Sequence, residues 1–171
     1  LRYQVATSLD GFIADDKGGY DWIVMDPDID FGALMAQFDT LLMGRGTYEI
    51  AGGGGPGFGD KAVYVVSTTL DPKQHKKVTI VSKDVEAFVA DLKKQSGNDI
   101  WLFGGGVLFR SMLEAGLVDR VELAIIPVLL GAGIPVLPGL DGVAKLKLDE
   151  VTRYPKSGTM LLGYEVVRTE R

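Results

Sequence analysis

The feature that most constrains this sequence is a repeated alternation of short apolar strands with amphipathic helices. Strands are expected at residues 3–7, 40–43, 62–66, 78–81, 100–103 and 118–126, and helices at 31–38, 45–51, 85–94 and 107–115. Such alternation is typical of parallel strands joined by helices that cover the sheet. Residues 146–154 and 160–168 alternate apolar and polar side chains around a Pro155–Gly158 turn, which predicts a C-terminal antiparallel hairpin. The sequence therefore predicts a three-layer α/β/α fold with a mostly parallel, mixed sheet.

The composition fits one globular domain and excludes several kinds of site. The chain has 171 residues, of which 46% are hydrophobic and 24% charged, and we expect a single domain over residues 1–171. It has no cysteine and one histidine, His75, which we expect in an exposed loop, so we expect no metal site. A net charge of −5 argues against a nucleic-acid partner. No apolar run reaches the ~18 residues of a membrane span, and we expect a cytoplasmic protein with no membrane partner.

Two glycine-rich junctions between a strand and a helix are candidate phosphate sites. Gly44–Thr47 follows the strand at 40–43, and Gly104–Gly106 follows the strand at 100–103. Ligands of open α/β sheets bind at the carboxyl ends of strands, where backbone amides attract anions and glycine permits close approach. Neither junction matches the G-x-G-x-x-G or P-loop pattern, and a tight packing turn is the alternative. Ser67, Thr68 and Lys83 follow two further strands and could hold a terminal phosphate, with a solvated turn as the alternative.

Several motifs occur in an order that carries a family resemblance. They are A-T-S-L-D-G-F-I-A at 6–14, M-G-R-G-T-Y at 43–48, S-T at 67–68, G-G-G at 104–106 and P-V-L-L-G at 127–131. Together they resemble the dihydrofolate reductase-like superfamily, and most closely its RibD C-terminal-domain branch, over nearly the whole chain. The resemblance implies a dihydrofolate reductase-like fold and an NADPH-dependent reductase of a small heterocyclic or sugar-derived substrate. The model for such an activity is the 5-amino-6-(5-phosphoribosylamino)uracil reductase of riboflavin biosynthesis. The alternatives are a pterin reductase of the dihydrofolate reductase type and a non-catalytic nucleotide-binding module.

The resemblance also implies roles for individual residues. The cofactor NADPH would be held by Ala6, Ile13, Gly44, Arg45, Thr47, Ser67, Thr68, Lys83, Gly104, Gly105 and Gly106. Gly46 stands where many relatives carry a second basic residue, which weakens the expected preference for NADPH over NADH. A phosphorylated substrate would need a further basic anchor, for which Lys61 and Lys73 are available. Related domains pair as homodimers, and the run Ile125–Leu130 could supply the contact or lie in the core.

Three aspartates near the predicted strands and helices are candidate catalytic residues. Asp28 and Asp30 open the helix at 31–38, where folate reductases place their substrate-binding carboxylate; the spacing from Gly44 favours Asp28 and the Asp-Phe pattern favours Asp30. A helix N-cap is the alternative for an aspartate at this place. Asp10, in the first loop, could face the nicotinamide or stabilise a turn with Gly11.

Aromatic side chains near these carboxylates are candidate walls for a flat substrate ring. We predict that Trp22 and Tyr48 bind substrate in this way, and Tyr20 is a further candidate. Burial in the core beneath the first loop is the alternative for Trp22.

Overall fold

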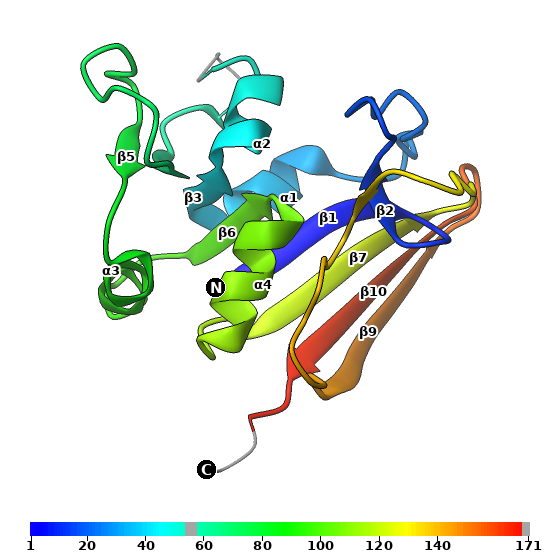
Figure 1. Cartoon of the computed structure of the whole chain (residues 1–171). Coiled ribbons are helices and arrows are strands. Elements are labelled where there is room, and N and C mark those ends of the chain that lie inside the picture. The colour runs from blue at the N-terminus through cyan, green and yellow to red at the C-terminus, as the bar shows by residue number, and fades with distance from the viewer. Residues whose placement is uncertain (54–57, 169–171) are drawn as a thin grey trace.

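A twisted eight-stranded sheet divides the molecule, and helices cover both of its faces (Figure 1). The computed structural model describes residues 1–53 and 58–168, so residues 54–57 of the predicted 52–59 loop lie outside the described part. The strand order is β5-β4-β3-β6-β1-β7-β10-β9. These strands are β1 (Arg2–Ser8), β3 (Phe38–Gly44), β4 (Ala62–Val66), β5 (Thr79–Val81), β6 (Asp99–Gly104), β7 (Arg120–Ile126), β9 (Leu146–Tyr154) and β10 (Thr159–Val166).

The sheet is parallel from β5 to β7 and antiparallel from β7 to β9. The two antiparallel pairings belong to β10, which lies between β7 and β9 and forms with β9 the predicted C-terminal hairpin. The mostly parallel, mixed sheet expected from the sequence is therefore confirmed.

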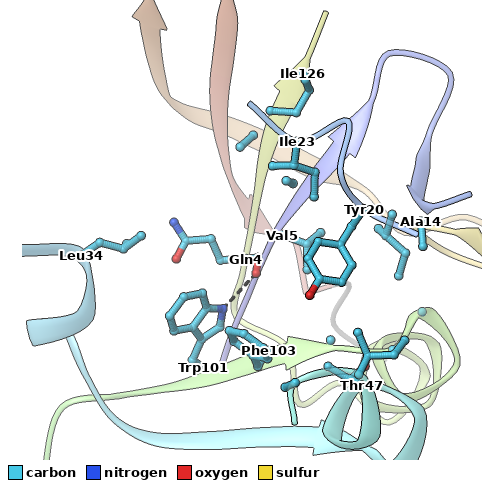
Figure 2. A pocket seen from close by; sticks show the side chains of 18 of the residues that line it. Gln4, Val5, Ala14, Tyr20, Ile23, Leu34, Thr47, Trp101, Phe103 and Ile126 are labelled. Carbon is cyan, nitrogen blue, oxygen red and sulfur yellow. Dashed lines mark hydrogen bonds between the residues drawn. The ribbon is translucent and has the colours of Figure 1, made fainter. Parts of the chain in front are cut away.

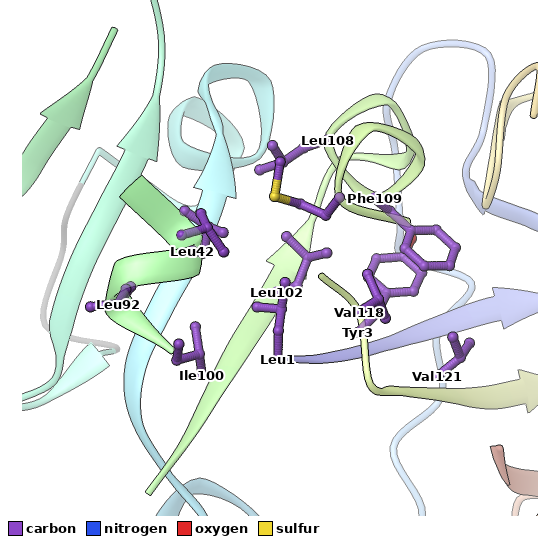
Figure 3. Packing of buried hydrophobic residues seen from close by; sticks show 12 residues of the cluster. Leu1, Tyr3, Leu42, Leu92, Ile100, Leu102, Leu108, Phe109, Val118 and Val121 are labelled. Carbon is purple, nitrogen blue, oxygen red and sulfur yellow. The ribbon is translucent and has the colours of Figure 1, made fainter. Parts of the chain in front are cut away.

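Two hydrophobic clusters fix the helices to the two faces of the sheet. On one face, helices α3 (Val85–Leu92) and α4 (Gly106–Glu114) contribute Val89 and Phe109 to a cluster that includes Leu102 of β6 (Figure 3). The ring of Phe109 stacks on Tyr3 of β1 with 3.8 Å between centroids. Since Tyr3 is fully buried, this stack anchors α4 over the middle of the sheet.

The opposite face carries the two short helices, α1 (Phe31–Ala36) and α2 (Arg45–Ile50). Tyr48 of α2 packs there with Leu41, Met43 and Trp101, and residues of α1 pack against the same cluster. In the described ranges, 1–53 and 58–168, no helix combines the length and the apolar character that crossing a bilayer requires.

A second, two-stranded sheet was not predicted. Strand β2 (Phe12–Ala14) pairs antiparallel with β8 (Ile134–Pro135), two segments that the sequence indicates only as loops. Strands of two and three residues carry too little periodicity to be recognised, since their pairing depends on contacts between distant parts of the chain.

Candidate active site

A cavity of about 1410 Å³ lies between the sheet and the first loop (Figure 2). Ala6 of β1, Phe103 of β6 and Ile126 of β7 contribute to its floor, and Ile13 and Tyr20 of the loop contribute to its wall. Small-molecule sites usually occupy ~300–1,000 Å³. The cavity is therefore large enough for a dinucleotide or for two smaller molecules together.

One end of the cavity is formed by the two glycine-rich junctions. Gly44, Arg45 and Thr47 line it after β3, and the three glycines at 104–106 line it after β6. A Cβ atom built on Gly44 or Gly46 would meet no other atom within 4 Å, so the backbone here is open to a ligand. The structure thus brings both predicted junctions to one surface, at the carboxyl ends of neighbouring parallel strands.

The glycines after β6 also have packing roles. Gly105 has a φ of +92°, which L-residues rarely adopt. A Cβ on Gly106 would lie 2.6 Å from the carbonyl oxygen of Pro135 and 2.7 Å from Cδ of Pro138. The packing turn that the sequence left open is therefore present at Gly106, in a residue that also lines the cavity.

Ser67, Thr68 and Lys83 lie outside the lining of the cavity. The Ser67 side chain is almost fully buried, and its Oγ accepts hydrogen bonds from the N–H groups of Thr69 and Leu70 at 3.2 and 3.1 Å. Thr68 and Lys83 are exposed. The pairing of Gly44 with Val66 places this turn at the same edge of the sheet as the first glycine junction. The hydroxyl of Ser67 is engaged in the turn, which was the alternative at this position.

Two of the three predicted catalytic carboxylates line the cavity. Asp30 is the N-cap of α1, and its Oδ1 accepts a hydrogen bond from the N–H of Ala33 at 2.9 Å. Asp28 pairs with Lys156 from the C-terminal hairpin, with Nζ and Oδ1 2.6 Å apart. Asp30 is therefore a helix N-cap, the alternative given for it above. The pairing of Asp28 with Lys156 was not indicated by the sequence.

The third carboxylate, Asp10, does not line the cavity. Its two oxygens accept hydrogen bonds from the backbone N–H groups of Leu130 and Gly131, and Oδ1 also accepts from the hydroxyl of Ser8 at 2.6 Å. The bond from Ser8, with that from Gly131, lowers the pKa of Asp10 to about 2. The carboxylate of Asp10 thus holds Ser8 and the loop after β7, and its catalytic role stays a prediction.

Asp26 is a buried carboxylate beside the site. Its Oδ2 accepts a hydrogen bond from the N–H of Ser157 at 2.7 Å, and its Oδ1 accepts one from the N–H of Asp28 at 3.0 Å. Desolvation raises its pKa, but hydrogen bonds from Asp28 and Ser157 outweigh this effect, and the pKa lies below its ordinary value. Asp26 therefore joins the first loop to the hairpin turn behind the cavity.

The predicted aromatic walls need a correction. Tyr48 is 1% exposed and packs in the core, where its hydroxyl donates to the carbonyl of Gly53 at 2.8 Å and lies 3.0 Å from Nδ1 of His75. His75 is consequently half-buried rather than exposed. The indole N–H of Trp22 donates to the carbonyl of Gly19, so its ring packs within the first loop. Tyr48 and Trp22 do not line the cavity, whereas Tyr20 does.

The aromatic floor of the cavity comes instead from β6. Trp101 and Phe103 both line the cavity, with ring centroids 4.9 Å apart in an edge-to-face arrangement. The indole N–H of Trp101 donates to the backbone carbonyl of Gln4 at 2.9 Å, which fixes the orientation of the ring (Figure 2). The sequence did not predict these two residues at the site, because it does not show which face of the buried strand β6 borders the cavity. Gln4, a polar residue within an apolar strand, was the one available signal for this part of the site.

The cavity, the glycine junctions and the strand order together correspond to one known family. A family model described as the RibD C-terminal domain matches residues 1–53 and 58–161. The chain belongs to the RibD C-terminal domain family. Among its relatives are the uncharacterized proteins YwjB and YyaP of Bacillus subtilis (strain 168), each 35% identical. The YwjB match covers 88% of this chain and 89% of YwjB, and the YyaP match covers 94% and 91%.

Solved structures of this family and of dihydrofolate reductase share the fold. A candidate riboflavin biosynthesis protein from Shewanella sp. PV-4 superposes with a TM-score of 0.80 at 28% identity, over 98% of each chain. A bifunctional deaminase and 5-amino-6-(5-phosphoribosylamino)uracil reductase from Thermotoga maritima gives 0.74 at 18%, over 97% of this chain and 56% of the other. Dihydrofolate reductase from Enterococcus faecalis, complexed with NADP(H), gives 0.69 at 18%, over 96% and 95%. The RibD C-terminal chain described here therefore has a dihydrofolate reductase-like fold whose named neighbours include reductases.

Proposed function

We propose that this chain is a cytoplasmic NADPH-dependent reductase that transfers hydride to a small heterocyclic or sugar-derived substrate. The observation that carries the proposal is one continuous cavity with two different ends. Its glycine-rich end exposes backbone at Gly44 and Gly46, and its other end combines apolar walls with the carboxylates of Asp28 and Asp30. A dinucleotide needs the first kind of surface for its phosphates, and a substrate ring needs the second.

At the glycine end, this chain offers both an open backbone and a positive charge. The side chain of Arg45 is half-exposed at the cavity and lies 3.8 Å from Glu49, which leaves most of its donors available to a phosphate. We assign the pyrophosphate to the two glycine junctions and the nicotinamide to the floor beside Ala6 and Ile13. NADPH, when bound, supplies the hydride. Ser67, Thr68 and Lys83 stay candidates for the adenosine phosphate, because they border the same edge of the sheet.

At the other end, a reduced carbonyl or imine must also gain a proton. Asp30 and Asp28 both line this end, and either can hold a substrate nitrogen or pass a proton through a bound water. The fold relationship to a dihydrofolate reductase complexed with NADP(H), and family membership alongside a named uracil reductase, support this assignment.

The proposal is tested by titrating the protein with NADPH and NADH and following nicotinamide fluorescence. We expect submillimolar binding of NADPH, weakened about tenfold or more by Arg45→Ala, because a charge-assisted contact contributes ~1.5–3 kcal/mol. Arg153→Ala is the matched control, since Arg153 is an exposed arginine of β9 away from the cavity lining. Absence of binding by either nucleotide at submillimolar concentration would overturn the reductase function and favour a repurposed fold.

We also propose that the protein forms a homodimer through the C-terminal half of the sheet. The edge strand β9 exposes Leu146, Leu148 and Val151. Part of the predicted contact run is unsuitable, since Ile126 is buried in the protein's own core, whereas Leu129 is 72% exposed. Light scattering should give a mass near twice the chain mass of 18.4 kDa. A monomeric mass at micromolar concentration would contradict the dimer.

A further inference from the structure

The end of the cavity away from the glycines opens into a smaller, charged pocket of about 270 Å³. The two hollows share five lining residues, namely Gln4, Leu34, Gln37, Glu150 and Leu161. A ligand that lies against Trp101 in the main cavity is therefore next to the charged groups of the smaller pocket. Whatever substituent the substrate carries at this end has to be compatible with those charges.

The charged groups gather because two parallel strands are in register. Arg2 and Gln4 of β1 pair with Arg120 and Glu122 of β7, so all four side chains stand on the face that carries the cavity. Glu122 is 4% exposed and receives both arginines, one through Nε of Arg120 and the other at 3.5 Å from Nη1 of Arg2. The buried carboxylate is thus the centre of the cluster.

Both arginines are already paired with carboxylates, although the buried Nε of Arg2 has no hydrogen-bond partner. Arg120 also binds Asp149 and, at 2.9 Å, Glu150, while Arg2 binds Asp99. With Glu122 the cluster contains two arginines and four carboxylates, a net charge of −2. Asp30, which also lines the main cavity, adds a further negative charge, whereas the charge of Asp28 is balanced by Lys156. Desolvating a phosphate dianion beside these groups is unfavourable, whereas a neutral or cationic ring meets no such penalty.

Gln4 marks the position of the ligand independently of the charges. Its side chain reaches from β1 toward Leu34 of α1 and stands beside Trp101 (Figure 2). The residue is 8% exposed, and its Oε1 is buried without a hydrogen-bond partner. A buried acceptor without a partner is uncommon because it loses its bond to water and gains nothing in return. A ring N–H inserted between Gln4 and Leu34 provides the missing donor.

We propose that this end of the cavity selects an unphosphorylated heterocycle, neutral or positively charged, with an N–H group that pairs with the carboxamide of Gln4. The inference rests on the proposed reductase function and narrows its substrate. It separates this chain from a reductase of a phosphoribosyl substrate. Lys61, one of the two anchors considered for such a phosphate, donates to the carbonyl of Phe38 and does not line the cavity, and neither does Lys73.

The test compares two probes that differ only in the phosphate: 5-amino-6-(5-phosphoribosylamino)uracil and its dephosphorylated form. Binding of each to the protein–NADPH complex is followed by tryptophan fluorescence, which reports on Trp101 in the cavity floor. We expect the dephosphorylated probe to bind at least tenfold more tightly. Glu150→Lys, which brings the cluster to a net charge of zero, should reduce that ratio severalfold. Glu86→Lys, the same change on α3 across the sheet, should leave the ratio unaltered.

The role of Gln4 is tested with Gln4→Met, which keeps the length of the side chain and removes the amide. We expect the dephosphorylated probe to bind about tenfold more weakly, with unchanged NADPH affinity. The melting temperature should not fall, because the amide has no bond to lose in the free protein. A lower melting temperature with unchanged probe affinity would show that Gln4 is only structural, and would overturn its assignment.

The remaining outcomes decide the proposal as well. Equal or tighter binding of the phosphorylated probe would overturn the proposed selection against phosphate. If the protein binds NADPH but neither probe, the proposal is also overturned, because it expects a ring of this size to bind against Trp101. Failure to bind NADPH is a different result, which removes the reductase function on which the inference rests.

Discussion

The start of α4 supports a quantitative prediction, because Gly106 lies directly against two backbone carbonyl groups of the segment after β8. In Gly106→Ala the new Cβ would lie 2.6 Å from the carbonyl oxygen of Pro135 and 3.0 Å from that of Val136, against about 3.4 Å for ordinary contact. The segment after β8 must therefore move by about 0.8 Å, or α4 must tilt. Overpacking of this kind costs ~1–3 kcal/mol, which corresponds to a melting temperature lower by ~2–12 °C in a chain of this length.

Gly46→Ala is the matched substitution, because its Cβ would meet no other atom within 4 Å and Gly46 lies within α2. Alanine should stabilise the free protein there by ~0.5–1 kcal/mol through its helix preference. Thermal unfolding followed by circular dichroism measures both variants. If Gly106→Ala melts at the wild-type temperature, the segment at 135–138 does not constrain α4, and the packing role assigned to Gly106 is refuted.

Two further predictions concern the core and the first loop. Phe109→Ala removes a ring stacked on Tyr3 and should lower the free energy of unfolding in urea by ~3–5 kcal/mol. Val107→Ala, at a position 61% exposed on the same helix, should change this free energy by less than ~0.5 kcal/mol. Equal losses in the two variants would contradict the packing of α4. The hydrogen bond from Ser8, with that from Gly131, holds the pKa of Asp10 at about 2, below its unfolded value, so its contribution to stability is present above about pH 4 and is lost as the pH falls toward 2. Urea midpoints measured from about pH 5 downward should therefore fall more steeply for the wild type than for Asp10→Asn, and parallel curves would count against this role.

The sequence was sufficient for the sheet because the main strands are buried on at least one face and have clear boundaries. The strand expected at 62–66 has those bounds in the structure, and the one expected at 3–7 extends by a single residue at each end. Helix α3 ends at Leu92 rather than at residue 94, because the N–H groups of Lys94 and Gln95 bond to carbonyls three residues earlier and tighten the last turn. Periodicity and glycine boundaries are local properties, so one sequence contains them in full.

The site was predictable only where the backbone itself forms it. Gly44 and Gly105 could be placed at the cavity because both stand at the carboxyl end of a strand, where open α/β sheets bind ligands. Tyr48 was misassigned because an aromatic side chain one turn into a helix can face either the core or a cavity, and the direction depends on the start of α2. Gln4 and Glu122 were missed together, since their cluster depends on the pairing of two strands that are far apart in the sequence.

Two of the motifs that carried the family resemblance contact each other in the structure, which their sequences did not reveal. Asp10 of the S-L-D-G segment accepts the N–H groups of Leu130 and Gly131 in the P-V-L-L-G segment, so the two motifs are halves of one contact. Two residues further on, a Cβ on Gly133 would lie 2.2 Å from the carbonyl oxygen of Ala14, an approach that only glycine allows. The β2–β8 pairing then continues this contact along the rim of the cavity. Asp10 thus helps to hold in place the loop that presents Ile13 to the cavity of the proposed reductase.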